Sequence, residues 1–215
     1  MSDFDDLLKR DLSWFDNPVE LETVDTVAAR TLKTKTRLAM KAALRKEKAA
    51  EIFDTLPAPG ESLHAISNGS FDYFHLAPIF IEHLGGHTEH FYGSTWTMNR
   101  ANVLDLFQMY DDGKIGSIAI LTGVYFKRRE SAVYATLLEG LQARGQRFIA
   151  FECHAKVMLL NAGPHYLAIE GSANFTANPR LENTVITNSR DVWEFHRTWM
   201  EQMLDGQAKN QRRRI

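Results

Sequence analysis

The chain has 215 residues, of which 44% are apolar and 24% are charged, and its formal net charge is −2 at pH 7. These values suffice for one folded domain with a substantial core and argue against a wholly disordered chain. The single cysteine, Cys153, excludes an intramolecular disulfide framework and fits a reducing compartment. The acidic N-terminus lacks the apolar core of a signal peptide, and no apolar run could span a bilayer. We therefore expect a cytoplasmic protein that makes no membrane contact.

Residues 1–58 are expected to form a helical, partly basic extension. From about Val27 to Leu56 the sequence contains neither Gly nor Pro, and apolar residues recur at helical spacing. This pattern fits a solvated face on a packing helix and a helix that contacts nucleic-acid phosphates equally well, because clustered Lys and Arg supply affinity for phosphate. In the second interpretation the contacting residues are Arg30, Lys33, Lys35, Arg37, Lys41 and Arg45.

Residues 59–206 are expected to form the main domain, which follows the helix-breaking sequence Pro57-Ala58-Pro59-Gly60. Short apolar runs predict strands at 62–67, 88–92, 115–121, 147–151, 156–160, 165–169 and 184–187. Helical patterns occupy 75–84, 99–110, 127–143 and 192–204, the second with a cap near Thr97 or Asn99. This alternation predicts an α/β sandwich around a largely central sheet.

Two further basic segments are candidate phosphate contacts. Residues 207–215 are expected to be a mobile tail, and they end in Arg212, Arg213 and Arg214. Lys127 and Arg128 follow a buried strand, where substrate loops often lie, although an ordinary helix start explains them equally well.

The densest group of reactive side chains lies between residues 153 and 183. His154 and Lys156 are two residues apart, which places both on one face of a strand. The turn Gly171-Ser172-Ala173-Asn174 can direct hydroxyl, amide and backbone N–H groups at an anion. Glu182 follows where a carboxylate could orient the histidine. Together these groups indicate a phosphoryl-transfer site, and the alternative for His154 is an ordinary core histidine.

This segment resembles the phospholipase D superfamily, whose signature is His-x-Lys, four residues, Asp, and then Gly-Ser-x-Asn. The residues that match it are His154, Lys156, Gly171, Ser172 and Asn174. The sequences of both motifs are especially similar to those of the nuclease-like branch. The order of elements from about residue 60 to 204 is similar to one copy of that fold, a mixed sheet with helices on both faces. The N-terminal extension lies outside the resemblance.

Asn161 departs from the family pattern, because it stands where the signature has Asp. That position usually supports the site rather than attacking the phosphate. Asparagine retains hydrogen-bonding capacity but not charge. The departure therefore weakens the expectation of activity without cancelling it.

The resemblance implies phosphodiester hydrolysis without a metal or other cofactor. His154 would attack phosphorus to form a phosphohistidine, and Lys156 and Asn174 would bind the phosphate oxygens. Ser172 would support them, Glu182 would hold the imidazole, and Asn161 and Gly171 would have supporting roles. A second histidine is needed as the general acid, and the chain carries only one motif. Single-copy members pair across a two-fold axis, so a homodimer with a composite site is expected.

Three functions remain under comparison. The first is a nuclease, with DNA as the expected partner. The second is a weak or inactive nucleic-acid-binding protein on the same fold, with its site reduced by Asn161. The third is a lipid phosphodiesterase, against which the basic flanks and the missing signal segment argue.

Two other patterns carry less weight. His83, His87 and His90, completed by Cys153 or His64, have spacing compatible with zinc, but Gly85-Gly86 interrupts the helix between the first two. The sequence Gly93-Ser94-Thr95-Trp96-Thr97 faintly echoes the Gly-Ser-x-Asn segment without a preceding His-x-Lys. It is interpreted as a strand end followed by a helix cap.

Overall fold

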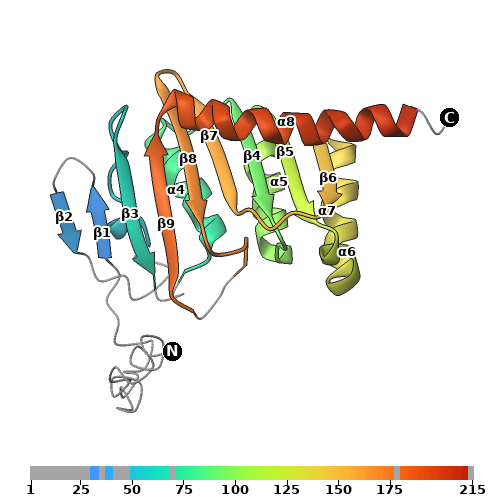
Figure 1. Cartoon of the computed structure of the whole chain (residues 1–215), viewed down its shortest axis with the longest axis horizontal. Helices are drawn as coiled ribbons and strands as arrows, with labels where there is room; N and C mark the ends of the chain where they lie inside the picture. Colours follow the sequence, from blue (N-terminus) through green and yellow to red (C-terminus); the bar gives the residue numbers. More distant parts are fainter. Residues whose placement is uncertain (1–29, 34–36, 41–48, 68–70, 177–179, 213–215) are drawn as a thin grey trace, which may run out of the picture.

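The computed structural model describes residues 30–33, 37–40, 49–67, 71–176 and 180–212. Its described strands form one sheet of nine strands in the order β2-β1-β3-β9-β8-β7-β4-β5-β6 (Figure 1). The strands are β1 Arg30–Lys33, β2 Arg37–Met40, β3 Ser62–Ser67, β4 His90–Thr95, β5 Ile118–Gly123, β6 Arg147–Phe151, β7 Val157–Ala162, β8 His165–Gly171 and β9 Glu182–Asn188.

The sheet is mixed. β4 pairs in parallel with β5, and β5 pairs in parallel with β6. Every other neighbouring pair among the described strands is antiparallel. Parallel neighbours need crossover connections, and α5 and the α6–α7 pair supply them.

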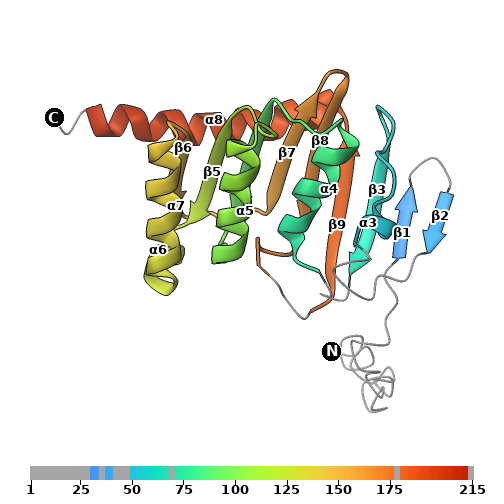
Figure 2. The same ribbon diagram turned by 180° about the vertical axis from the view of Figure 1, so that it is seen from behind.

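Helices cover both faces of the sheet. Figure 2 shows α3, α4, α5 and α7 on one face, and Figure 1 shows α8 lying across the other. The described helices are α3 Ala49–Ile52, the 3-10 helix η3 Tyr73–His75, α4 Leu76–His83, α5 Arg100–Asp111, α6 Tyr125–Arg129, α7 Ser131–Ala143 and α8 Arg190–Arg212. The expected mixed-sheet sandwich with helices on both faces is therefore confirmed.

The two faces bury separate hydrophobic cores. On β7, Met158 and Leu160 belong to the larger core toward α4 and α5, whereas Val157 and Leu159 belong to the smaller core toward α8. A strand that is buried on both faces carries a continuous apolar run instead of an alternating pattern. Each fully buried Leu-sized side chain contributes about 1.5–3 kcal/mol relative to an exposed one.

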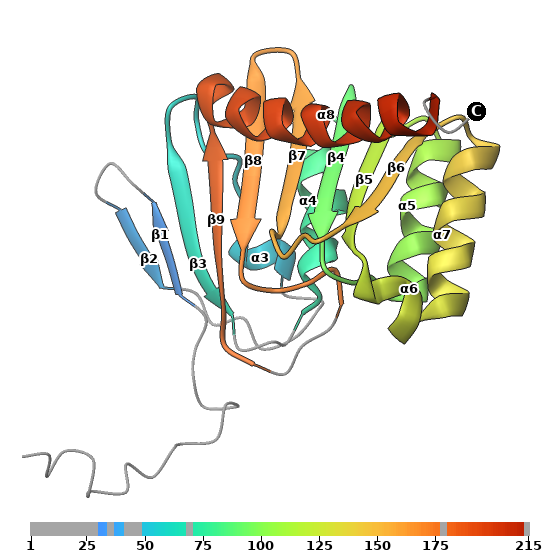
Figure 3. The same cartoon turned by 45° about the vertical axis from the view of Figure 1, so that its right-hand side comes forward.

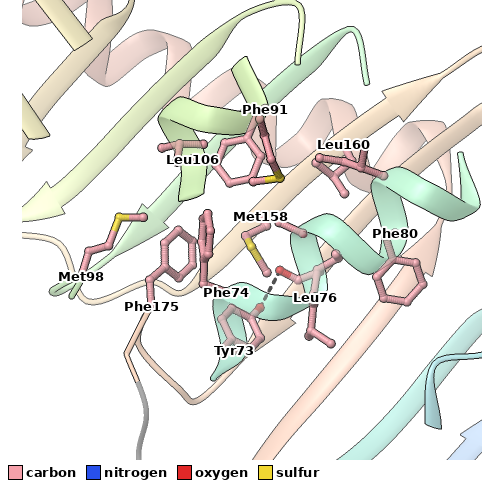
Figure 4. Packing of buried hydrophobic residues seen from close by; sticks show 14 of the residues in the cluster. Tyr73, Phe74, Leu76, Phe80, Phe91, Met98, Leu106, Met158, Leu160 and Phe175 are labelled. Carbon is pink, nitrogen blue, oxygen red and sulfur yellow. Dashed lines mark hydrogen bonds between the residues drawn. The ribbon is translucent and has the colours of Figure 1, made fainter. Parts of the chain in front are cut away.

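The larger core extends to the edge of the sheet at which β8 ends. Tyr73 in η3 donates a 2.8 Å hydrogen bond to the carbonyl oxygen of Ile169, and its ring lies 5.9 Å from that of Phe175 (Figure 4). Burial raises the pKa of the Tyr73 phenol well above its ordinary value. Tyr73 is therefore a neutral, fixed support beneath the segment that follows β8.

The helical prediction for residues 27–56 is wrong over β1 and β2. β1 pairs antiparallel with β2 and with β3, so backbone hydrogen bonds extend the sheet here. The absence of Gly and Pro permits a helix. However, the edge of β3 that faces away from β9 has free backbone hydrogen-bonding groups, and pairing with them favours a strand here despite the local helical pattern. Helix is present only in the short α3, and residues 41–48 lie outside the described part. The boundaries drawn at residues 58 and 206 stay a prediction.

Two helices differ from their predicted lengths. The helix expected at 127–143 is divided into α6 and α7 at Glu130, whose φ of −133° and ψ of 53° are not helical. The helix α8 continues through the predicted tail as far as Arg212, so this part is helical, and its expected mobility stays a prediction. Among the described residues, no helix is long and apolar enough to cross a membrane.

Candidate active site at one edge of the sheet

Apart from Asn161, the predicted catalytic and supporting residues gather at one edge of the sheet. The strands β3, β4, β5, β6 and β8 end at this edge, and β7 and β9 begin there, as the pairing directions require (Figure 3). The carboxyl ends of parallel strands in open α/β sheets are where ligands commonly bind. This edge is therefore a candidate location for the active site.

His154 and Lys156 lie on the segment that joins β6 to β7. The Nζ atom of Lys156 is 2.8 Å from His154 Nδ1 and 3.4 Å from Nε2, and it donates to the His154 carbonyl oxygen at 2.6 Å. The imidazole is exposed, whereas Lys156 is only 7% exposed. A protonated lysine in this position donates to Nδ1, so the neutral ring carries its own proton on Nε2.

The burial of Lys156 affects its charge. Burial lowers the pKa of its ammonium group, because the charged form is less well solvated, while Cys153 and Glu182 oppose this effect. The lysine is therefore a cation whose charge is held in a poorly solvated place. Such a cation gains more from an incoming phosphate than one surrounded by water does.

The end of β8 brings the second motif against the first. Gly171 N donates to the Lys156 carbonyl oxygen at 3.2 Å. A Cβ at Gly171 would stand 2.7 Å from Tyr73 Cε2 and 2.9 Å from the Asn183 carbonyl oxygen, so a larger residue does not fit. The motif glycine is therefore explained by close backbone approach.

Ser172 and Glu182 form a pair beside Lys156. Ser172 Oγ donates to Glu182 Oε2 and accepts from the Asn183 backbone N–H at 3.2 Å. Glu182 is 9% exposed and acts electrostatically on Lys156. The carboxylate expected to hold the imidazole is thus bonded to the motif serine.

Asn174 is held by the segment that follows β4. Its Oδ1 accepts from the Trp96 backbone N–H at 3.2 Å, and the next residue, Phe175, donates its N–H to Thr95 Oγ1 at 3.1 Å. The Trp96 ring also lies 5.9 Å from the His154 ring. Trp96 therefore connects the Asn174 amide with the imidazole, and all five motif residues meet at one edge.

No protein-family model matches the chain, and no curated protein matches it. Among solved structures, the polyphosphate kinase from Porphyromonas gingivalis has a TM-score of 0.50 at 16% identity, over 67% of this chain and 26% of that one. The phospholipase D family member Nuc from Salmonella typhimurium has a TM-score of 0.48 at 14% identity, over 66% of this chain and 95% of that one. NucT from Helicobacter pylori has a TM-score of 0.44 at 11% identity, over 58% of this chain and 84% of that one.

The chain shares its fold with the polyphosphate kinase structure over 67% of its own length. At 16% identity this likeness concerns the fold alone.

Asn161 does not lie with the other motif residues. It stands near the opposite end of β7, five residues from Lys156, which corresponds to about 16 Å along a strand. Its Nδ2 donates to Glu89 Oε2 at 2.8 Å, and its N–H donates to Thr88 Oγ1 at 2.9 Å. The residue that departs from the signature therefore joins β7 to the start of β4 and does not touch the phosphate site.

The alternative zinc site is not assembled. His83 Nε2 lies 2.6 Å from the Phe53 carbonyl oxygen, His87 Nδ1 lies 2.9 Å from that of Gly113, and His90 Nδ1 lies 2.8 Å from Ser117 Oγ. Within the described ranges, no three His, Cys, Asp or Glu side chains are grouped so as to hold a metal ion.

The predicted phosphate contacts have separate locations. Lys127 and Arg128 are exposed on α6, at the edge that carries the motif residues. Arg30, Lys33 and Arg37 lie on β1 and β2 and Arg212 ends α8, but their side chains are outside the described part. Lys35, Lys41, Arg45, Arg213 and Arg214 lie wholly outside it.

The structure adds residues that the sequence did not select. A pocket of about 400 Å³ adjoins Asn174 and is lined by Trp96 and by three arginines, Arg100, Arg129 and Arg180. Two of its residues lie in or beside segments that the sequence analysis singled out, although neither pattern marks a pocket. Trp96 lies in the segment that echoes the Gly-Ser-x-Asn motif, and Arg129 directly follows Lys127 and Arg128.

Proposed function

We propose that the protein is a metal-independent phosphodiesterase that cleaves nucleic acid, with DNA as the first substrate to test. One observation carries this proposal: the buried Lys156 ammonium is 2.8 Å from the exposed His154 imidazole, at the edge where Asn174 and Ser172 also lie. A nucleophilic histidine beside a cation and amide donors is what phosphoryl transfer requires.

Lys156 and Asn174 supply the electrostatic part. A non-bridging phosphate oxygen is a stronger acceptor than an imidazole nitrogen, so a bound phosphodiester draws Nζ away from the ring. This exchange frees a ring nitrogen for attack and leaves the cation on the phosphate. The pair between Ser172 and Glu182 keeps the neighbouring turn in place.

The reaction then has two displacements. A ring nitrogen of His154 forms a bond to phosphorus while the bond from phosphorus to the leaving sugar oxygen breaks, and a general acid protonates that oxygen. Water next attacks the phosphohistidine, the N–P bond breaks, and the same group, now a base, accepts the water's proton. The products are a free hydroxyl and a phosphate monoester.

The general acid comes from a second copy of the chain. The sequence carries one His-x-Lys motif, so the partner subunit's His154 would complete the site across a two-fold axis. Exposed apolar side chains at the same edge support this arrangement: Val124 is 38%, Tyr125 is 56% and Leu181 is 52% exposed. Such side chains suit a surface that another copy covers.

The test is cleavage of single-stranded and plasmid DNA by the purified full chain in excess chelator. Cleavage is expected, and His154→Ala should reduce its rate by at least about 100-fold. The matched control is His87→Ala, an exposed histidine away from this edge, which should cleave like the wild type. Absence of cleavage, or equal cleavage by His154→Ala, would contradict the proposal.

The composite site has its own test. Wild type and His154→Ala are co-expressed in equal amounts, so that mixed dimers form. If both histidines serve one site, only about one quarter of the dimers are active, whereas independent subunits would keep about one half of the activity. Sedimentation of the wild type as a strict monomer would equally contradict the composite site.

The two alternatives are less well supported. The inactive binding protein depends on the loss of charge at Asn161, and that residue is about 16 Å from Lys156 along β7. Salt-dependent DNA binding without any cleavage would restore it. Release of choline from phosphatidylcholine would instead support the lipid phosphodiesterase.

A further inference from the structure

The pocket beside the candidate active site has its own chemistry. It has a volume of about 400 Å³, and its lining includes Trp96, Arg100, Arg129, Glu130, Asn174 and Arg180. Its wall is built from the segment between β4 and α5, the end of α6, the start of α7 and the segment after β8. Figure 3 shows the end of β4 and the helix α6 at the same edge of the sheet.

The charge of the pocket favours an anion. Arg100, Arg129 and Arg180 are exposed on its wall, and Glu130 is the one carboxylate among the described lining residues. Within the described part of the chain, neither Arg100 nor Arg180 forms an ion pair. Guanidinium groups without a carboxylate partner are suited to phosphate oxygens.

The pocket also offers an aromatic surface. The Trp96 ring is half-buried, and the Arg129 guanidinium carbon lies 5.7 Å from its centre. The Tyr125 ring lies 6.5 Å away. A tryptophan beside arginines is the combination with which proteins stack and neutralise the nucleotides of a single strand.

The pocket opens directly from the proposed phosphate site. Asn174 lines the pocket, and its Oδ1 accepts from the Trp96 backbone N–H, while the Trp96 ring lies 5.9 Å from that of His154. A polymer whose phosphate reaches His154 therefore has its next nucleotide beside Trp96. A bare phosphate monoester would leave the pocket unfilled.

We propose that this pocket binds the nucleotide next to the scissile phosphate, with its base against Trp96 and its flanking phosphate on Arg100 and Arg180. This inference rests on the proposed function and deepens it, because it selects an unpaired strand. A base within a duplex is stacked and paired and cannot offer its face to a side chain. The volume lies in the range of sites for single small molecules.

Binding is measured with the His154→Ala protein, so that cleavage does not interfere. A fluorescent 12-nucleotide strand should bind at least about 10-fold more tightly than the same sequence as a duplex. Trp96→Ala should weaken binding of the strand by about 5- to 100-fold. Arg100→Ala and Arg180→Ala should each weaken it. Each should also lower the number of counterions released on binding, measured from the slope of log affinity against log salt concentration, by about one. Lys114→Ala, an exposed cation at the opposite edge, is the control and should leave binding unchanged.

A second measurement does not depend on the folding of the Trp96 variant. Strands with one abasic nucleotide, moved stepwise along the sequence, are bound to the His154→Ala protein. At one position the missing base should weaken binding by about 5- to 100-fold, the loss expected for one base stacked on an aromatic ring. Linear inorganic polyphosphate, which has charge but no bases, should compete poorly at equal phosphate concentration.

The outcomes separate the two proposals. Equal binding of intact and abasic strands, or equal competition by polyphosphate, would overturn the nucleotide assignment while DNA cleavage in chelator still stood. Conversely, base-dependent binding in this pocket together with a wild type that cleaves nothing would overturn the nuclease and leave the nucleotide pocket in place.

Discussion

The side-chain amide of Asn161 donates a 2.8 Å hydrogen bond to Glu89 Oε2, near the end of β7 that lies farthest from His154. The Asn161 backbone is also engaged, because its carbonyl oxygen accepts from Thr88 Oγ1 and from the Glu89 N–H. The residue is 4% exposed. Asn161 therefore helps to hold β7 against the start of β4. Its uncharged amide can donate to the Glu89 carboxylate, which an aspartate could not do.

Restoring the signature residue should damage stability and leave catalysis alone. Asn161→Asp would replace a donor with a second carboxylate facing Glu89, which should cost about 1–3 kcal/mol of unfolding free energy at pH 7. Urea unfolding measures the cost, and the DNA cleavage rate should change less than about twofold. Adding Glu89→Gln should recover stability, since an amide can donate to the new carboxylate. A large loss of cleavage at unchanged stability would show that Asn161 serves the site.

The motif glycine should be intolerant of a side chain. Gly171→Ala places a Cβ 2.7 Å from Tyr73 Cε2 and 2.9 Å from the Asn183 carbonyl oxygen, and such overpacking costs about 1–3 kcal/mol. Gly206→Ala is the matched control. Gly206 lies in α8, where an added methyl group would meet no atom within 4 Å, so alanine should stabilise by about 0.5–1 kcal/mol. Thermal unfolding measures both changes, and equal behaviour of the two variants would contradict the close approach at Gly171.

The strands of the main domain could be predicted because each is a short apolar run between turn signals. β3 and β6 have the bounds that the sequence indicated. β1 and β2 could not be predicted in this way, because their strand conformation depends on pairing with β3, which is remote in sequence. The position of Asn161 could also have been anticipated, since an odd spacing from Lys156 along a strand places two side chains on opposite faces.

The motif residues could be predicted because their spacing follows a family signature, whereas the pocket could not. Trp96, Arg129 and Asn174 come from three segments, remote in sequence, that the order of strands in the sheet brings together. No local pattern marks such a meeting point. The sequence therefore indicated the residues that meet at this edge of the sheet and missed most of those that line the neighbouring pocket.

The buried Lys156 should limit activity at high pH. Because burial lowers its pKa below the ordinary value of 10.5, the ammonium loses its proton, and the site its cation, at a lower pH than an exposed lysine would. The value of kcat/KM for DNA should therefore fall as pH rises through that lowered pKa. Lys156→Arg should move the fall to higher pH at a reduced rate, since arginine stays charged but has a different shape.

The fall should not reflect unfolding. The unfolded chain holds this lysine proton more tightly than the folded chain, so the contribution of Lys156 to stability rises with pH between its lowered pKa and 10.5. Circular dichroism across the same pH range separates the two effects. An alkaline fall that is identical in wild type and Lys156→Arg would assign it to another group.

Tyr92 should make stability depend on pH in the opposite direction. Burial, and then its 2.6 Å hydrogen bond to Glu201 Oε1, raise the pKa of its phenol to about 12. A raised pKa contributes stability that is complete below the unfolded value of 10.0 and is lost as pH rises from 10 to about 12. Tyr92→Phe should therefore cost about 1–2 kcal/mol at pH 8, and the difference from wild type should shrink toward pH 12. Urea unfolding at pH 8 to 11.5 measures this, and the absorbance difference between the two proteins near 295 nm locates the titration. A Tyr92→Phe cost that stays constant across that range would mean that the phenol contributes packing and no linked proton.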